Sequence, residues 1–170
     1  MNQKNSLGLD KCFGELENPF KLFEEWFDKA KKSELNDPNA LALATSDKEG
    51  IPSVRMVLLK GFSEKGFVFY TNLNSKKSED IKINPNASMC FHWKSLLRQI
   101  RIVGNINPVS DKDADEYYNS RGYGSRIGAW ASKQSKILSN RDELYQSIDF
   151  FKKKYPDKNI VPRPEYWSGW

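Results

Sequence analysis

The stretch "RMVLLKGFSEKGFVFYTNLNSKK", residues 55–77, decides the fold. Two runs rich in β-branched and aromatic residues flank a turn at residues 61–66, and this pattern predicts a β-hairpin. The strands are expected over residues 51–62 and residues 67–72. The centre of the chain is therefore predicted to form antiparallel β-structure.

Cations mark both ends of this stretch. In a regular strand Arg55 and Lys60 lie on opposite faces, because side chains alternate. They would bind two different anions or mark two solvated strand ends. A helix is expected over residues 75–83, with Lys76 and Lys77 in its first turn. The free N–H groups of a helix start favour a bound anion, so the alternatives are phosphate binding and solvent exposure.

The remaining segments indicate helices around a β core. An N-cap at Asn18 and a proline at position 19 predict a helix start. A glycine-rich connection or strand is expected over residues 122–132 and a proline-rich closing segment over residues 156–170. Because short turns join the strands, we predict a mainly β fold with peripheral helices (α+β), a mostly antiparallel barrel or sandwich. Further strands are expected at residues 40–45, 86–93 and 99–106, and helices at residues 110–121 and 140–155.

The composition fits one folded unit. The chain has 170 residues, of which 38% are hydrophobic, and a net charge of +5. We expect residues 1–17 to be a flexible tail and residues 18–170 to be a single domain. The positive charge is compatible with a nucleic acid, a phosphorylated small molecule or simple solubility.

Several classes of protein are disfavoured. Two cysteines, Cys12 and Cys90, are too few for a disulfide framework, and a single histidine makes a metal site improbable. No segment resembles a signal peptide or a membrane span. We therefore expect a cytoplasmic protein without a metal.

A second polar group is predicted after the central strands. Tyr117 and Arg121 are four apart on an expected helix and so share one face. Ser125 follows a glycine-containing turn that lets backbone approach a ligand. The three residues predict a second phosphate site, and a surface arginine beside a half-buried tyrosine is the alternative. Gln99, in an expected strand, needs a partner such as a heteroaromatic ring or neighbouring backbone.

Five stretches together resemble one family. "RMVLLKGFSEKGFVFYTNLNSKK", "LLRQIRIVG", "EYYNSR", "SRIGAWASKQS" and "VPRPEYWSGW" occur in the order and at the spacing of the pyridoxamine/pyridoxine 5'-phosphate oxidases. The resemblance implies an FMN-binding split β-barrel that forms a homodimer with FMN between subunits. It implies oxidation of pyridoxine or pyridoxamine 5'-phosphate to pyridoxal 5'-phosphate with O2 reduced to peroxide, and no nucleic-acid or membrane partner.

The resemblance also implies site residues. The substrate phosphate would contact Lys60, Tyr117, Arg121 and Ser125. Arg55, Lys76 and Lys77 would hold the FMN phosphate. The full set of FMN contacts would be Arg55, Met56, Val57, Leu58, Leu59, Lys60, Tyr70, Thr71, Lys76, Lys77, Gln99, Gln134 and Ser135.

The chain departs from the family at its C-terminal end. It ends at Trp170, whereas the family continues into a strand whose arginine and histidine touch substrate. The resemblance therefore assigns no catalytic residue here. Two alternative functions are a catalytically weak or inactive protein that binds FMN or pyridoxal phosphate, and a basic RNA-binding module.

Overall fold

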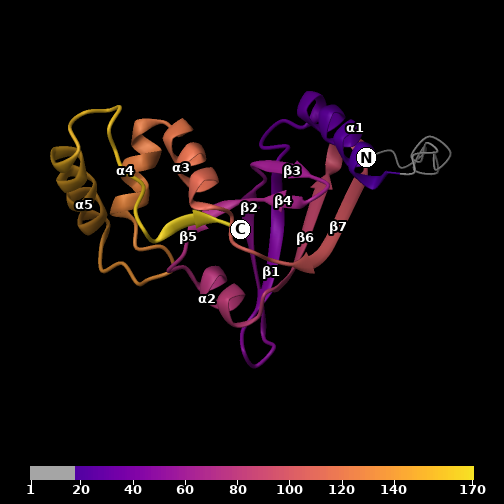
Figure 1. Cartoon of the computed structure of the whole chain (residues 1–170), viewed down its shortest axis with the longest axis horizontal. Coiled ribbons are helices and arrows are strands. Elements are labelled where there is room, and N and C mark those ends of the chain that lie inside the picture. The colour runs from indigo at the N-terminus through magenta and orange to yellow at the C-terminus, as the bar shows by residue number, and fades with distance from the viewer. Residues whose placement is uncertain (1–17) are drawn as a thin grey trace.

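The computed structural model describes residues 18–170. The predicted tail at residues 1–17 lies outside the described residues, and the single domain stays a prediction. The chain has a four-stranded sheet, and Figure 1 shows this sheet next to a group of helices, with β5 and β8 between them. The elements are α1 (Pro19–Ser33), β1 (Ala40–Ser46), β2 (Pro52–Leu58), β3 (Gly61–Ser63), β4 (Gly66–Val68), β5 (Tyr70–Asn72), α2 (Lys76–Ile83), β6 (Asn86–Trp93), the 3₁₀ turn η2 (Lys94–Leu96), β7 (Arg98–Asn105), α3 (Asp111–Ser120), α4 (Tyr123–Ala131), α5 (Arg141–Lys154) and β8 (Trp167–Gly169).

All strand pairs are antiparallel, as predicted. The main sheet has the order β2-β1-β6-β7, and β3 pairs with β4 and β5 with β8. Side chains alternate strictly on β1, where Leu41 and Leu43 are fully buried and the alanines before, between and after them are half-buried. The sheet therefore has one face in the core and one outer face.

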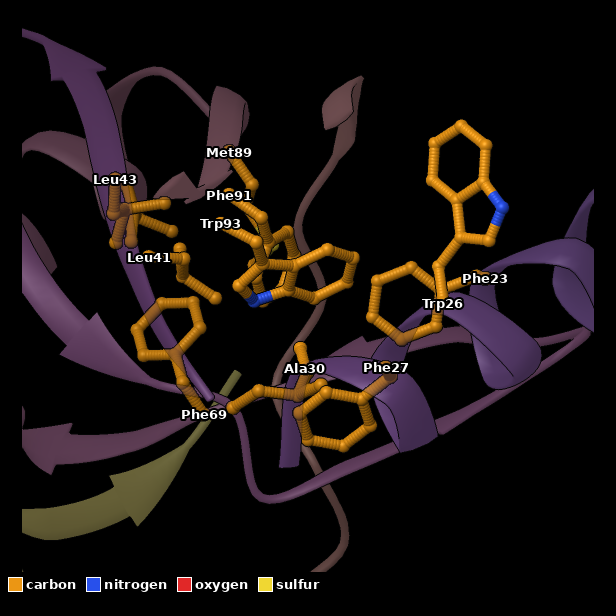
Figure 2. Packing of buried hydrophobic residues seen from close by; sticks show 12 residues of the cluster. Phe23, Trp26, Phe27, Ala30, Leu41, Leu43, Phe69, Met89, Phe91 and Trp93 are labelled. Carbon is orange, nitrogen blue, oxygen red and sulfur yellow. The ribbon is translucent and has the colours of Figure 1, made fainter. Parts of the chain in front are cut away.

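The core lies between this sheet and α1. The side chain of Asn18 accepts a hydrogen bond from Phe20 N and caps the helix, as predicted. Phe23 and Phe27 of α1 pack against Phe91 and Trp93 of β6 (Figure 2). The β3–β4 hairpin closes the same cluster through its phenylalanines. This aromatic core covers one face of the sheet. Strand β2 lies at an edge of the sheet.

The predicted strand over residues 51–62 is wrong in one respect, because the structure divides it into β2 and β3. Its backbone changes partners at the break. Leu59 N donates to Asn39 O, beside β1, but Lys60 N donates to Val68 O at the end of β4, both at 2.8 Å. Arg55 and Lys60 consequently do not lie on the two faces of one regular strand.

The predicted strand over residues 67–72 is divided for the same reason. β4 pairs with β3, whereas Phe69 exchanges backbone hydrogen bonds with Trp170 and β5 pairs with β8. The closing segment, expected to be only proline-rich, thus contributes a strand. The segment over residues 122–132, expected to be a connection or strand, is helix α4. The other predicted helices and strands are confirmed within a few residues.

Candidate functional site

A cavity of about 670 Å³ opens between strand β2 and the helical part of the chain. Its walls come from β2, β5, the start of α2, the end of α3, α4 and β8. Pockets of a few hundred Å³ upward with a few convergent polar groups are typical of small-molecule sites. It is lined by these predicted site residues: Met56, Val57, Leu58, Lys60, Tyr70, Thr71, Lys77, Tyr117, Arg121, Ser125 and Gln134.

Lys77 is one of the cations that line the cavity. Its side chain is buried, and its Nζ donates to Thr71 Oγ1, Ser75 Oγ and Gln134 Oε1 at 3.0–3.1 Å. All three acceptors are uncharged, so the charge of the ammonium group is not neutralised. Burial, and then repulsion from Arg55, lowers the pKa of Lys77 to about 8. A phosphate would find here a cation without a competing carboxylate.

Arg55 and Lys76 have a carboxylate partner, unlike Lys77. Asp80 is almost completely buried, and it forms an ion pair with Lys76, one helical turn before it. Arg55 Nη2 lies 3.9 Å from Asp80 Oδ2, and Arg55 Nη1 donates to Thr45 Oγ1 at 2.7 Å. Burial raises the pKa of Asp80 by itself, but hydrogen bonds from Lys76 and Thr45 outweigh it and lower the pKa. These two cations stand behind the cavity rather than on its wall.

A second group of lining residues contains Arg121, Lys60 and Tyr117. The guanidinium carbon of Arg121 lies 4.6 Å from the ring centroid of Trp167, and its Nη1 is buried without a hydrogen-bond partner. Burial lowers the pKa of Arg121. Lys60 Nζ lies 5.8 Å from the ring centroid of Tyr117. Two cations, of which Arg121 has an unpartnered N–H group, therefore line the same cavity.

Helix α4 contributes small residues to this volume. Gly122, Ser125, Gly128, Ala129 and Ser132 all line the cavity and recur at helical spacing. A Cβ added at either of these glycines would meet nothing within 4 Å, so the glycines face open space. The residues that suggested a glycine-rich connection or strand instead line the open side of a helix, whose opposite face is buried through Ile127 and Ala131.

Arg55 and Lys76 do not line the cavity, and neither do three further predicted FMN contacts. Leu59 is buried in the core. Ser135 has φ 66° in the loop after α4 and borders a separate depression against α5. Gln99 is exposed on β7, at the opposite edge of the sheet from β2. Three strand spacings separate those edges, about 14 Å.

Two residues were missed by the sequence reasoning. Asp80 is the counter-ion of Lys76, and its position four residues later on the same helix was an available signal. Trp167 forms a wall of the cavity from a strand that was not predicted. Among residues 18–170 no helix is long and apolar enough to cross a membrane, and no cluster of three or more His, Cys, Asp or Glu could hold a metal ion.

Comparison with known proteins identifies the relatives of the chain. A family model described as pyridoxamine 5'-phosphate oxidase matches residues 27–151. The chain is 69% identical over 170 residues to the pyridoxine/pyridoxamine 5'-phosphate oxidase of Pelagibacter ubique, covering all of this chain and 82% of that one. It is 58% identical over 157 residues to the Brucella canis enzyme of the same name, covering 92% and 77%.

Solved structures share the fold. PhzG from Burkholderia lata, in complex with tetrahydrophenazine-1-carboxylic acid, superposes with a TM-score of 0.84 at 26% identity, covering 91% of this chain and 75% of that one. A pyridoxamine 5'-phosphate oxidase-related, FMN-binding protein from Nostoc punctiforme superposes with a TM-score of 0.69 at 16% identity, covering 89% and 79%. The chain belongs to the pyridoxine/pyridoxamine 5'-phosphate oxidase family.

Proposed function

We propose that this chain is an FMN-dependent oxidase of pyridoxine and pyridoxamine 5'-phosphate, forming pyridoxal 5'-phosphate and hydrogen peroxide. The observation that carries the proposal is a single cavity with unneutralised cations at two places, Lys77 and Arg121. The reaction needs two phosphate esters held together, one on the cofactor and one on the substrate. The oxidases of Pelagibacter ubique and Brucella canis support the same assignment.

The cavity fits FMN in size and in donor chemistry. A volume of about 670 Å³ accommodates a planar ring system with a phosphorylated chain. The buried ammonium group of Lys77 suits the phosphate because it has no carboxylate partner, so that a phosphate would compete only with the uncharged acceptors Thr71, Ser75 and Gln134. Bound FMN would supply hydride acceptance and reoxidation by O2. Strand β2, from Met56 to Leu58, supplies a wall along which the ring can lie.

Arg55 and Lys76 would act from behind Lys77. Because Asp80 partly neutralises them, their attraction for the FMN phosphate is weaker than their charges alone indicate. A phosphate dianion near Lys77 would still be stabilised by both. These two residues therefore tune the affinity, while Lys77 makes the direct contact.

The substrate phosphate is assigned to Arg121, Lys60, Tyr117 and Ser125. Arg121 has a free buried N–H donor, and Ser125 is exposed at the start of α4. Fixing one phosphate here and the other at Lys77 would hold the two ring systems against each other. Such positioning converts an encounter of two molecules into a reaction within one complex.

We propose further that the active form is a homodimer. Gln99 cannot reach the cavity of its own subunit from the far edge of the sheet. The outer face of the sheet, however, presents small or apolar side chains in one row: Met56 is 65% exposed, and Ala42 and Cys90 are half-buried beside it. A second copy packed on this face would bring its Gln99 toward the flavin.

The decisive experiment is anaerobic reduction of the FMN-loaded protein. Pyridoxine 5'-phosphate should bleach the flavin absorbance, and admission of O2 should restore it with release of peroxide. Pyridoxine, which lacks the phosphate, is the matched control and should bleach it far more slowly. A yellow protein that pyridoxine 5'-phosphate does not reduce would be a binding protein instead. Failure to bind FMN, together with salt-sensitive RNA binding, would favour an RNA-binding module.

A further inference from the structure

Three aromatic rings form a nearly parallel layer on the wall of the cavity. The ring centroids of Tyr70 and Tyr117 are 4.1 Å apart with an interplanar angle of 17°, and those of Tyr70 and Trp167 are 5.6 Å apart at 7°. Tyr118 packs edge-on against the same indole at 5.1 Å. The guanidinium group of Arg121 lies over that indole. The arginine thus rests on a rigid aromatic support.

The indole face of Trp167 takes the place of the carboxylate partner that a buried arginine usually has. None of the ion pairs formed by residues 18–170 includes Arg121. A ring face attracts a cation without accepting its N–H groups, so the donors of Arg121 remain available. A carboxylate would occupy those donors and cancel the charge. The unpartnered Nη1 is the visible consequence.

The indole is held in place independently of any ligand. Trp167 is 6% exposed, and it lies on β8 opposite Asn72 of β5. Its carbonyl oxygen accepts a hydrogen bond from Arg163 Nη1 at 2.9 Å, and Arg163 also forms ion pairs with Asp111 and Asp115 at the start of α3. The ring is therefore fixed before a ligand arrives.

We propose that Trp167 is the positioning residue of the substrate-phosphate site, where its indole face keeps Arg121 oriented and free to donate. The inference rests on the proposed function, because it takes the anion at Arg121 to be the substrate phosphate. Trp167 acts through Arg121, so its removal should weaken recognition of the phosphate rather than of the pyridine ring.

The test measures ligand affinity of the FMN-loaded protein by calorimetry. Pyridoxal 5'-phosphate and pyridoxal are compared for the wild type, Trp167→Phe and Trp167→Leu. The Leu variant should bind pyridoxal 5'-phosphate about two- to thirty-fold more weakly, while its affinity for pyridoxal stays unchanged. The Phe variant should fall between, because phenylalanine retains a weaker ring face. Trp26→Leu is the matched control, since Trp26 lies under Arg98 far from the cavity and should alter stability alone.

A double-mutant cycle separates positioning from packing. In an Arg121→Met background, Trp167→Leu should cause no further loss of affinity for pyridoxal 5'-phosphate. Equal losses for pyridoxal and its phosphate, or full additivity with Arg121→Met, would show mere packing and overturn the inference. If Trp167→Leu does not fold, Trp167→Phe carries the same comparison. A wild type that binds no pyridoxal 5'-phosphate would overturn the proposed function as well. If the wild type binds it and both Trp167→Phe and Trp167→Leu bind it with unchanged affinity, this inference alone is overturned.

Discussion

The Nζ atom of Lys77 lies 3.0 Å from Oε1 of Gln134, although 57 positions separate the two residues. This contact joins the start of α2 to the loop after α4, and both residues line the cavity. The neighbouring Lys76 points to Asp80 instead. Of two adjacent lysines, one therefore has only uncharged hydrogen-bond partners and the other is paired with a carboxylate.

Substitution of Lys77 should reduce FMN affinity far more than substitution of Lys76. Lys77→Met removes a buried charged donor, and a charge-assisted contact to phosphate contributes about 1.5–3 kcal/mol. Lys76→Met is the matched control, because its side chain is half-exposed and paired with Asp80. Affinity is measured by fluorescence titration of the apoprotein with FMN. Equal losses in the two variants would contradict the assignment of Lys77 as the direct contact.

FMN affinity should fall as pH rises above about 8. Burial, and then repulsion from Arg55, lowers the pKa of Lys77 from 10.5 to about 8, so the ligand-free protein loses this charge in alkaline solution. The phosphate remains a dianion there, since its second pKa is near 6. Binding should therefore take up a proton near pH 8. The Lys77→Met variant should have a flat affinity profile, and a wild type with the same flat profile would argue against the mechanism.

The same lysine should make the ligand-free protein more stable in mild alkali. Between about pH 8 and pH 10.5 the unfolded chain holds a proton that folded Lys77 has lost. The free energy of unfolding therefore rises with pH across this window for this group. Urea denaturation of the wild type and Lys77→Met at pH 7.5 and pH 9.5 measures the difference. The free energy of unfolding should rise more between these two pH values for the wild type than for Lys77→Met.

Asp80→Asn should destabilise the fold. The substitution leaves Arg55 and Lys76 without their buried counter-charge, at a cost of about 1–3 kcal/mol in the free energy of unfolding at pH 7. Because the folded pKa of Asp80 is below 3.8, this contribution is present above the unfolded pKa and disappears as pH falls through the folded value. Asp28→Asn, which breaks the exposed pair with Lys31, is the control and should cost less than about 1 kcal/mol. Similar costs for both variants would refute a structural role for Asp80.

Gly169→Ala should also destabilise the chain. A Cβ at position 169 would lie 2.7 Å from two ring atoms of Tyr70, so the ring or strand β8 must move. Such overpacking typically costs about 1–3 kcal/mol. Gly104→Ala on β7 is the control, because nothing lies within 4 Å of an added Cβ there. Thermal unfolding of both variants checks the difference, and equal melting temperatures would disprove the crowding.

A charge in the middle of the outer sheet face should separate the proposed dimer. Ala42→Arg places a guanidinium group between Met56 and Cys90 of the neighbouring strands. Sedimentation should give a dimer for the wild type and a monomer with weaker FMN binding for the variant. Lys29→Glu, on α1 away from this face, should remain dimeric. A monomeric wild type that binds FMN tightly would rule out the dimer.

Local patterns in the sequence were sufficient for most elements. The Asn18–Pro19 start of α1 and the alternation along β1 and β6 follow from capping and from the two-residue period of strands, which neighbouring residues encode by themselves. The motifs also indicated the family and the cavity residues from Met56 to Gln134. These features need no knowledge of distant parts of the chain.

Tertiary structure decided what depends on partners far away in the sequence. Strand β2 ends at Leu58 because the backbone of Lys60 bonds to Val68, and β8 exists because it pairs with β5. α4 is a helix despite its glycines, because Ile127 and Ala131 find a core to pack into. Long-range hydrogen bonds and burial are invisible to local periodicity. For the same reason, only the fold could pair Lys76 with Asp80 while leaving Lys77 and Arg121 without a carboxylate partner.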